Sequence, residues 1–158
     1  MMREEKVRRL PMLVSSLVAL ALAVIPLPSV VDQLRPDFLV LVVFFWSIES
    51  PRAGGLALAF FSGLALDVIN GVVLGQHALA LTLMAAWATN LRLRLRVFSV
   101  LSQSLTIFML LTLYQFILFW IDGATGNPVV NYGRWLAPVI GAAIWPILSA
   151  TLSRARER

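Results

Sequence analysis

Cysteine is absent from the chain, and histidine, tyrosine and charged residues are scarce. The 158 residues include no cysteine, one histidine and two tyrosines, and only 13% of them are charged. The missing thiols exclude disulfide bonds, thiolate metal sites and cysteine nucleophiles. The low charge, together with a hydrophobic content of 59%, lies outside the range of soluble domains. The composition therefore predicts an integral membrane protein.

Six apolar runs fill the chain, separated by short segments that hold proline, glycine or arginine. The second and third runs are short for a bilayer core of roughly 30 Å, so we expect shielding by protein at one end or locally thinned lipid around them. We predict an all-α fold in which residues 1–158 form a single transmembrane domain, a six-helix bundle with helices at about 10–27, 37–48, 53–69, 74–90, 98–121 and 135–152.

The placement of the basic residues predicts the orientation of the helices. A net charge of +5 would suit a nucleic-acid-binding protein, but the basic residues lie at the chain ends and in short loops. With a cytoplasmic N-terminus, eleven of the thirteen Lys and Arg residues fall inside, and only Arg35 and Arg134 fall outside. This positive-inside asymmetry requires an even number of helices. We therefore predict that both termini are cytoplasmic and that no nucleic acid is bound.

Asp67 is flanked on both sides by residues apolar enough to lie in a bilayer. An intramembrane carboxylate is costly unless it faces protein or water, so it is a candidate functional group. It could serve as a structural acceptor, contact a partner, or act as a proton relay or catalytic acid. We favour the structural role, with hydrogen bonds from the turn through Gly71 and Gly75 or from Arg35. The single histidine, His77, comes without metal-ligand spacing, so no catalytic, metal or cofactor site is predicted.

Two further polar segments have simple interpretations. His77 is expected at the start of the fourth helix, bonded across the turn to Asp67 or Asn70, and a pH-sensing role is the alternative because histidine titrates near neutral pH. The segment Arg35-Pro36-Asp37 suits a helix N-terminus, because proline lacks the N–H that would be unsatisfied there and aspartate favours the helix dipole.

Small residues recur along two predicted helices. Gly55, Ala59 and Gly63 are spaced by four, and Ala19 and Ala23 form a shorter stripe on the first helix. Such stripes let two helix backbones approach closely in a membrane. The third-helix stripe serves either an internal contact, which we favour, or a partner protein, and the Ala19–Ala23 stripe is equally open to both interpretations. The five residues are therefore the candidate partner interface.

One ordered series of residues extends over nearly the whole chain. Its most specific block is Gly63-x-x-x-Asp67-x-x-x-Gly71-x-x-Leu74-Gly75-x-x-Ala78-Leu79. The rest of the series comprises Arg35-Pro36-Asp37-Phe38, Trp46, Ser50-Pro51-Arg52 and Trp145-Pro146. The series resembles the bacterial rod shape-determining membrane protein family MreD, and the length and the arginine-rich C-terminus are similar too.

The resemblance implies a function and a set of partners. It implies a non-enzymatic, multi-pass inner-membrane scaffold of the cell-elongation (rod) complex, which supports lateral peptidoglycan synthesis and rod cell shape. The implied partners are MreC first, then MreB, RodA and a class B penicillin-binding protein in the same assembly, with membrane lipids around them and a homodimer left open. The six-helix arrangement is also similar to the substrate-binding subunits of energy-coupling-factor transporters. The alternative function is therefore a small-molecule- or lipid-binding subunit of a membrane transporter.

Overall fold

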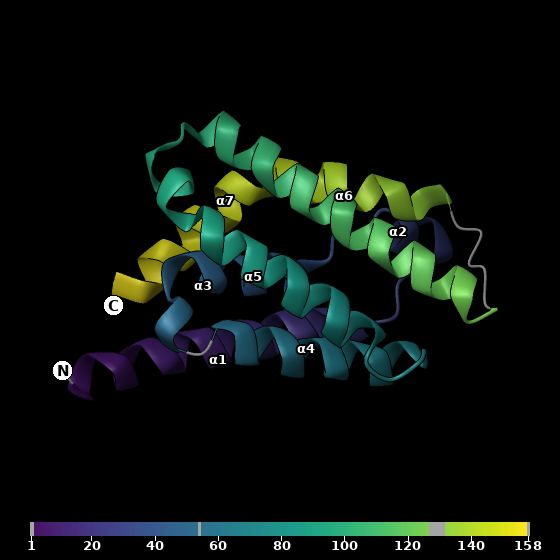
Figure 1. Ribbon diagram of the computed structural model, residues 1–158, viewed down its shortest axis with the longest axis horizontal. Coiled ribbons are helices and arrows are strands. Elements are labelled where there is room, and N and C mark those ends of the chain that lie inside the picture. The colour runs from purple at the N-terminus through teal and green to yellow at the C-terminus, as the bar shows by residue number, and fades with distance from the viewer. Residues whose placement is uncertain (1, 54, 127–131, 158) are drawn as a thin grey trace.

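The fold consists of α-helices and short 3₁₀ helices in the part of the chain that the structure describes. A computed structural model describes residues 2–53, 55–126 and 132–157, and no strand occurs among them. The all-α prediction is confirmed. Figure 1 shows the elements, which are α1 (Met2–Val24), α2 (Ser29–Gln33), α3 (Phe38–Glu49), η1 (Pro51–Ala53), α4 (Gly55–Asn70), α5 (Gln76–Val97), α6 (Val100–Ala124), η2 (Tyr132–Leu136) and α7 (Ala137–Glu157).

The six longer helices, α1 and α3 to α7, lie over the six predicted apolar runs and differ from them mainly at their ends. The clearest differences are at two basic segments. α1 begins at Met2, ahead of the predicted start near residue 10, and α5 continues through Arg92, Arg94 and Arg96 to Val97, where a cytoplasmic loop was predicted. Arginine is a good helix former, and a cation in the last turn favours the helix dipole, so the basic segment extends α5. The five-residue α2 was not predicted.

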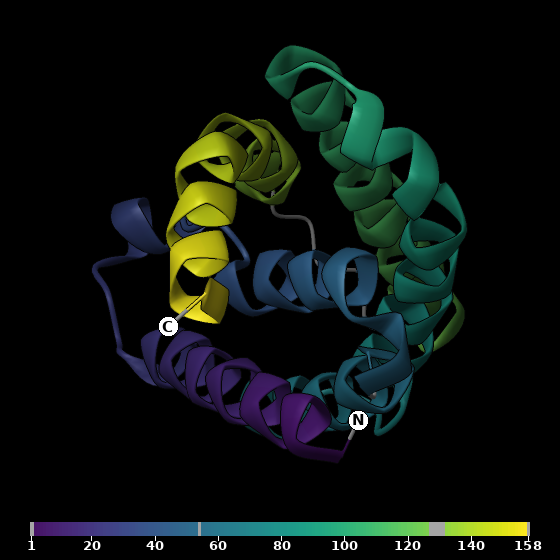
Figure 2. The same ribbon diagram turned by 90° about the vertical axis from the view of Figure 1, so that its left-hand side faces the viewer.

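α3 is the central helix of the bundle. Every residue from Leu39 to Ile48 is buried, and α1, α4, α5 and α7 pack around it (Figure 2). A helix that is hydrophobic on all sides belongs in a core. Its 12 residues span about 18 Å at 1.5 Å per residue, which is shorter than a bilayer core of roughly 30 Å. The neighbouring helices cover it. Shielding by protein therefore explains the short second run.

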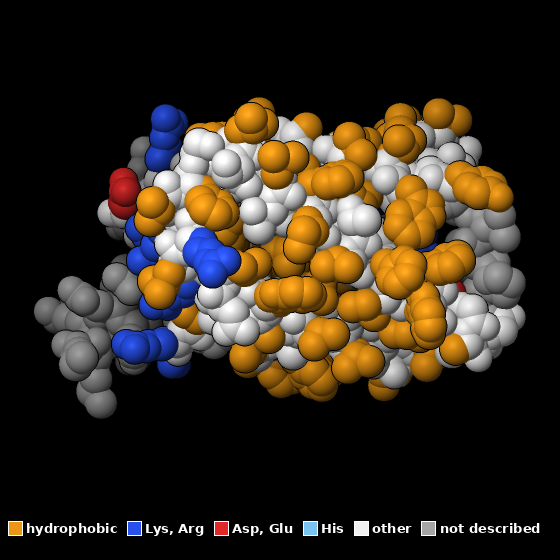
Figure 3. Space-filling view, turned by 45° about the horizontal axis from the view of Figure 1, so that its top comes forward, with side chains coloured by type: hydrophobic (Ala, Val, Ile, Leu, Met, Phe, Trp, Pro, Cys, Tyr) orange, Lys and Arg blue, Asp and Glu red, His pale blue; other side chains and the backbone are white. Residues whose placement is uncertain are grey.

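Two helical segments are long and apolar enough to cross a membrane by length and composition. They are α6 and the stretch Tyr132–Glu157, which includes α7, whereas Arg9–Val24 and Gly55–Asn70 are apolar but shorter. Apolar side chains are spread along the whole face seen in Figure 3, and Lys and Arg gather at the end of the bundle where α1 begins and α7 ends. A wide exposed apolar surface of this kind indicates contact with a membrane or with other proteins.

The small-residue stripe of α4 packs inside the chain. Gly55, Ala59 and Gly63 are all buried. A Cβ atom on Gly63 would lie 2.5 Å from the backbone nitrogen of Ala78 in α5, and one on Gly55 would lie 3.1 Å from Cα of Ser47 in α3. The backbones therefore touch at both positions. The geometry favours the internal-contact interpretation of this stripe over partner binding.

The shorter stripe on α1 also faces inward. Ala19 is 3% exposed and belongs to the core, and Ala23 is half-buried against it. Residues on the opposite face of α1, such as Leu17 at 64% exposed, are turned outward instead. A partner helix would therefore meet large apolar side chains on α1, not its alanines.

Candidate functional site

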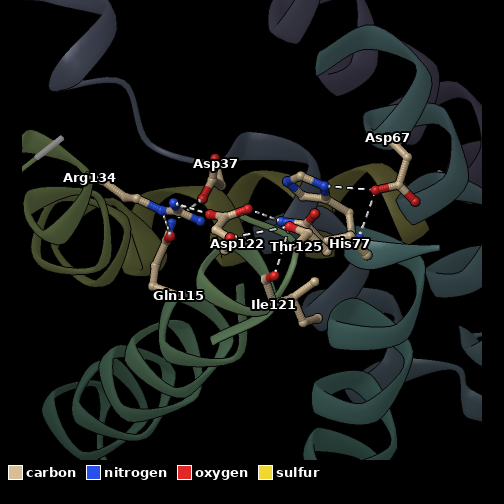
Figure 4. A network of polar contacts seen from close by, with 9 residues as sticks. Asp37, Asp67, His77, Gln115, Ile121, Asp122, Thr125 and Arg134 are labelled. Carbon is tan, nitrogen blue, oxygen red and sulfur yellow. Dashed lines mark hydrogen bonds and ion pairs between the residues drawn. The ribbon is translucent and has the colours of Figure 1, made fainter. Parts of the chain in front are cut away.

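Polar and charged side chains from five segments meet at one end of the bundle (Figures 1 and 4). This end is opposite the one where α1 begins and α7 ends. The segments are the loop before α3, the end of α4, the start of α5, the second half of α6, and η2. We call this set the polar network, and its members are Asp37, Asp67, Gln76, His77, Gln115, Asp122 and Arg134.

Asp67 holds the start of α5. It is 1% exposed. Its Oδ2 accepts the backbone N–H of Gly75 at 2.8 Å, and its Oδ1 accepts the backbone N–H of His77 at 2.8 Å. Nδ1 of His77 lies 2.9 Å from Oδ1, and we assign the proton to Nδ1 because an ionised carboxylate is an acceptor only. One buried carboxylate thus receives three donors, as expected for a structural acceptor.

Two glycines shape the turn that presents these donors. Gly71 has φ 63° and Gly75 has φ 100°, in the left-handed region that side chains with a Cβ disfavour. Gly75 donates to Asp67, whereas the N–H of Gly71 bonds to the carbonyl of Val68. The first N–H groups of a helix lack intrahelical partners, and negative charge is favoured beside them. Asp67 therefore caps α5 from the neighbouring helix.

Asp122 and Arg134 form a partly buried ion pair at the centre of the polar network (Figure 4). Nη1 of Arg134 lies 2.6 Å from Oδ2 of Asp122, and the side chains are 17% and 8% exposed respectively. The other carboxylate oxygen accepts from Nε2 of Gln76 at 2.5 Å. Both oxygens of Asp122 are therefore bonded, and they join α6 to η2 and to the first residue of α5.

Gln115 extends the network toward α3. Its Oε1 accepts from Nε of Arg134 at 2.9 Å, and its Nε2 donates to Oδ2 of Asp37 at 3.0 Å. A side-chain amide offers one acceptor and two donors, and both ends are used here. Gln115 thereby links the Asp122–Arg134 pair to the segment that leads into the central helix.

A groove of about 280 Å³ lies among these residues, and its lining includes Asp37, His77, Tyr114 and Arg134. The ring centroids of His77 and Tyr114 are 6.4 Å apart. The groove therefore runs between the Asp67–His77 contact and the Asp122–Arg134 pair, the two halves of the polar network.

The arrangement ties helices together and gives each of its carboxylates a bonded partner on another segment. Asp67, Asp122 and Arg134 each have a direct hydrogen-bonded partner in the network. Among the residues that the structure describes, no three His, Asp or Glu side chains are grouped to hold a metal ion. Buried polar groups that are fully bonded rigidify a core, and loss of one partner is strongly destabilising. The geometry is that of an interhelical polar lock.

Arg35 was one of the two predicted sources of hydrogen bonds to Asp67, but it does not reach that carboxylate. Its Nη1 donates to the carbonyl of Ile25 at 2.9 Å and lies 3.6 Å from Oδ1 of Asp32. The unpredicted α2 separates α1 from α3 and supplies Asp32 as the nearer partner. Arg35 therefore fastens the α1–α3 connection.

Pro36 and Asp37 precede α3, close to where the sequence analysis placed a helix start. Asp37 is the N-cap residue of α3, but its side chain makes no capping hydrogen bond. It bonds to Gln115 on α6 instead. A tertiary contact thus replaces the expected local role of Asp37.

Gln115, Gln76 and Arg134 were not recognised as site residues from the sequence. Gln115 offered a signal, because it is an amide within the longest apolar run, and polar groups in such runs are rare and usually bonded. Arg134 and Gln76 offered none. Arg134 lies between two predicted helices and Gln76 lies in the first turn of the fourth predicted helix, and at both places a polar residue is expected on the surface.

Comparison with known proteins gives a consistent result. The family model described as "rod shape-determining protein MreD" matches residues 4–154. A curated relative, "Rod shape-determining protein MreD" of Haemophilus influenzae, is 26% identical over 141 residues, which cover 89% of this chain and 87% of the relative. No solved structure matches the chain, so the likeness to energy-coupling-factor transporter subunits stays a prediction.

Proposed function

The chain belongs to the MreD family of rod shape-determining proteins, and we propose that it is a non-enzymatic scaffold of the cell-elongation complex. In this proposal it lies in the bacterial inner membrane, binds MreC, and supports lateral peptidoglycan synthesis. MreB, RodA and a class B penicillin-binding protein belong to the same assembly. The observation that carries the proposal is the family match over residues 4–154, which leaves almost no part of the chain unaccounted for.

The geometry supports a scaffold. The carboxylates of the polar network are bonded to groups on other helical segments, and large apolar side chains are exposed on the outer helix faces. Nothing in the described residues favours the transporter alternative. A protein with such a surface acts most simply through helix-to-helix contacts, which in lipid depend on close packing and hydrogen bonds.

We propose six membrane crossings with both termini in the cytoplasm. The positive-inside asymmetry of the sequence supports this orientation, and the gathering of basic side chains at the end of the bundle with the described termini agrees with it (Figure 3). The polar network then lies at the periplasmic end. α3 is shielded from lipid by its neighbours, so its short length is compatible with a buried crossing.

The surface that meets MreC is proposed to lie on outward helix faces. Gly55, Ala59 and Gly63 are occupied by contacts within the chain. Leu17 of α1 and Phe61 of α4 are 64% and 67% exposed and represent the large apolar side chains that remain available. Enlarging one of them should disturb partner binding without loosening the bundle.

Copurification tests the scaffold proposal directly. A tagged copy of the chain, extracted in mild detergent from a rod-shaped host, is expected to bring down MreC. An unrelated single-pass inner-membrane protein with the same tag, expressed to the same level, serves as the control and should not. If MreC is absent from the eluate although the tagged chain restores rod shape to a host that lacks its own copy, direct binding of MreC is excluded and the proposal fails.

A further inference from the structure

A second groove lies at the opposite end of the bundle from the polar network. It has a volume of about 290 Å³ and is bounded by the ends of α3 and α5, the start of α6 and the second half of α7. Figure 2 shows this end, with α7 on one side, the α5–α6 turn on the other and α3 between them. Its lining residues are Phe45, Ile48, Glu49, Leu95, Arg96, Val100, Gln103, Trp145, Pro146, Ser149, Ala150 and Ser153. The groove therefore combines apolar side chains with the polar Gln103, Ser149 and Ser153, and it is charged at Glu49 and Arg96.

The charged part of the groove carries an excess of positive charge. Glu49 is paired with Arg96, at 3.5 Å, and with Arg156. One carboxylate thus faces two guanidinium groups. Both arginines retain access to the surface, because their side chains are 47% and 31% exposed. The last turn of α7 also holds the exposed Glu157, which lines no part of the groove.

The charge lies close to the apolar side chains. The rings of Phe45 and Trp145, which both line the groove, are 6.5 Å apart. Glu49 follows Phe45 by four residues on α3, a rise of about 6 Å along a helix. A molecule with an apolar tail and an anionic head joined by a short linkage would therefore match both parts at once.

We propose that this groove binds an anionic phospholipid, with an acyl chain along the apolar side chains and the headgroup phosphate on Arg96. Arg156 lies just outside the lining and is paired with Glu49 of the groove, so it adds positive charge beside the headgroup. Basic pockets between membrane helices on the cytoplasmic side are suited to anionic headgroups. The inference goes beyond the scaffold proposal, and it rests on the proposed orientation only for placing the lipid in the inner leaflet.

The charge beside the groove favours a lipid over an apolar partner helix. Arg96 and Arg156 together outweigh Glu49 next to the apolar side chains of Phe45 and Trp145, which suits an acyl chain that carries an anionic headgroup. Binding of a partner helix at this place is a separate outcome that the experiment below distinguishes.

Native mass spectrometry of the purified full chain tests the inference, with phosphatidylglycerol and phosphatidylcholine as the probes. The chain is titrated with each lipid in detergent, and the retained lipid is counted. Phosphatidylglycerol should be retained at least about fivefold more tightly than phosphatidylcholine, since one headgroup–arginine contact at the surface contributes about 1 kcal/mol. Equal retention of the two lipids overturns the proposal.

Two variants locate the site. Ala150→Phe fills the groove from an exposed position on α7. It should lower phosphatidylglycerol retention at least about fivefold, because a displaced lipid loses its headgroup contact with arginine. Ile147→Phe is the matched control, because Ile147 is 71% exposed and lines no part of the groove, and it should change retention by less than about twofold. Equal effects of the two phenylalanine variants contradict the assignment.

A charge variant provides an independent check that does not depend on packing. Arg96→Gln leaves Glu49 paired with Arg156 and should lower phosphatidylglycerol retention about fivefold. Phosphatidylcholine retention should fall by less, because its choline already offsets the charge of its phosphate. Arg154→Gln, at an exposed position outside the groove, is the control.

If Ala150→Phe keeps its lipid but loses copurification with MreC, the groove holds a partner helix and the lipid proposal is wrong. Failure of MreC to copurify with the unmodified chain refutes the scaffold proposal without touching the lipid result.

Discussion

Gly63→Leu should destabilise the bundle by about 3 kcal/mol or more, the upper end of the cost of overpacking. A Cβ atom at this position already lies 2.5 Å from the backbone nitrogen of Ala78 and 2.8 Å from the carbonyl carbon of His77. Backbone atoms cannot move aside as a flexible side chain can, so α4 and α5 must separate. The measurement is the thermal midpoint of the purified protein in detergent, together with its level in the membrane.

The glycines of the chain supply a graded control. Gly63→Ala should already lower the midpoint, and Gly55→Ala should lower it less, because the nearest atom to its Cβ is Cα of Ser47 at 3.1 Å. Gly123→Ala on α6 should be neutral or slightly stabilising, since nothing lies within 4 Å of the added carbon and alanine is the better helix former. If Gly63→Leu instead leaves the midpoint unchanged and abolishes MreC copurification, the stripe is a partner interface after all.

Asp67→Leu should cost about 3 kcal/mol or more, because it leaves three donors without an acceptor and each buried unsatisfied group costs about 1–3 kcal/mol. The donors are the backbone N–H groups of Gly75 and His77 and Nδ1 of His77. Asp67→Asn keeps one side-chain oxygen and should cost clearly less. The readouts are the thermal midpoint and the recovery of the folded protein.

Asp32→Leu is the matched control for the loss of a carboxylate. The side chain of Asp32 is 58% exposed and its pairing with Arg35 spans 3.6 Å, so its replacement should cost no more than about 1 kcal/mol. The structural role of Asp67 would be refuted by one result from its two variants. If the leucine and asparagine variants both keep normal stability and both lose rod-shape complementation completely, the negative charge itself acts in function.

Much of the fold follows from local properties of the sequence. The apolar runs around Leu110 and Trp145 are long enough to predict helices without reference to the rest of the chain. Glycine at positions 71 and 75 predicted a turn, and the structure shows positive φ angles at both. The acceptor role of Asp67 also followed, because a carboxylate so placed needs donors and the turn is the nearest source.

The sequence did not show which residues meet across helices. The central position of α3 depends on the packing of four other helices around it, and the run 37–48 shows only that it is apolar. The bond between Gln115 and Asp37 joins residues 78 positions apart, and no local pattern encodes it. The stripe of Gly55, Ala59 and Gly63 predicted a close helix contact, and the backbones do approach closely at Gly55 and Gly63. Whether such a contact lies inside the chain depends on the tertiary arrangement.

The same arrangement separates two kinds of polar group. The end with the polar network holds carboxylates bonded to neighbouring helices, whereas the opposite end holds arginines in the last turns of α5 and α7. Cations in a last turn are favoured by the helix dipole and by anionic headgroups. The orientation of the whole molecule therefore decides where the polar network and the lipid groove act.

Single-cysteine labelling tests that orientation most directly, because the chain has no cysteine of its own. Ala124→Cys and Ala155→Cys place a thiol at exposed positions at the two ends of the bundle. With a membrane-impermeant maleimide, the account predicts labelling of Ala124→Cys in intact spheroplasts and of Ala155→Cys only after lysis. Labelling of Ala155→Cys in intact spheroplasts, or of Ala124→Cys only after lysis, would contradict the proposed six-crossing topology.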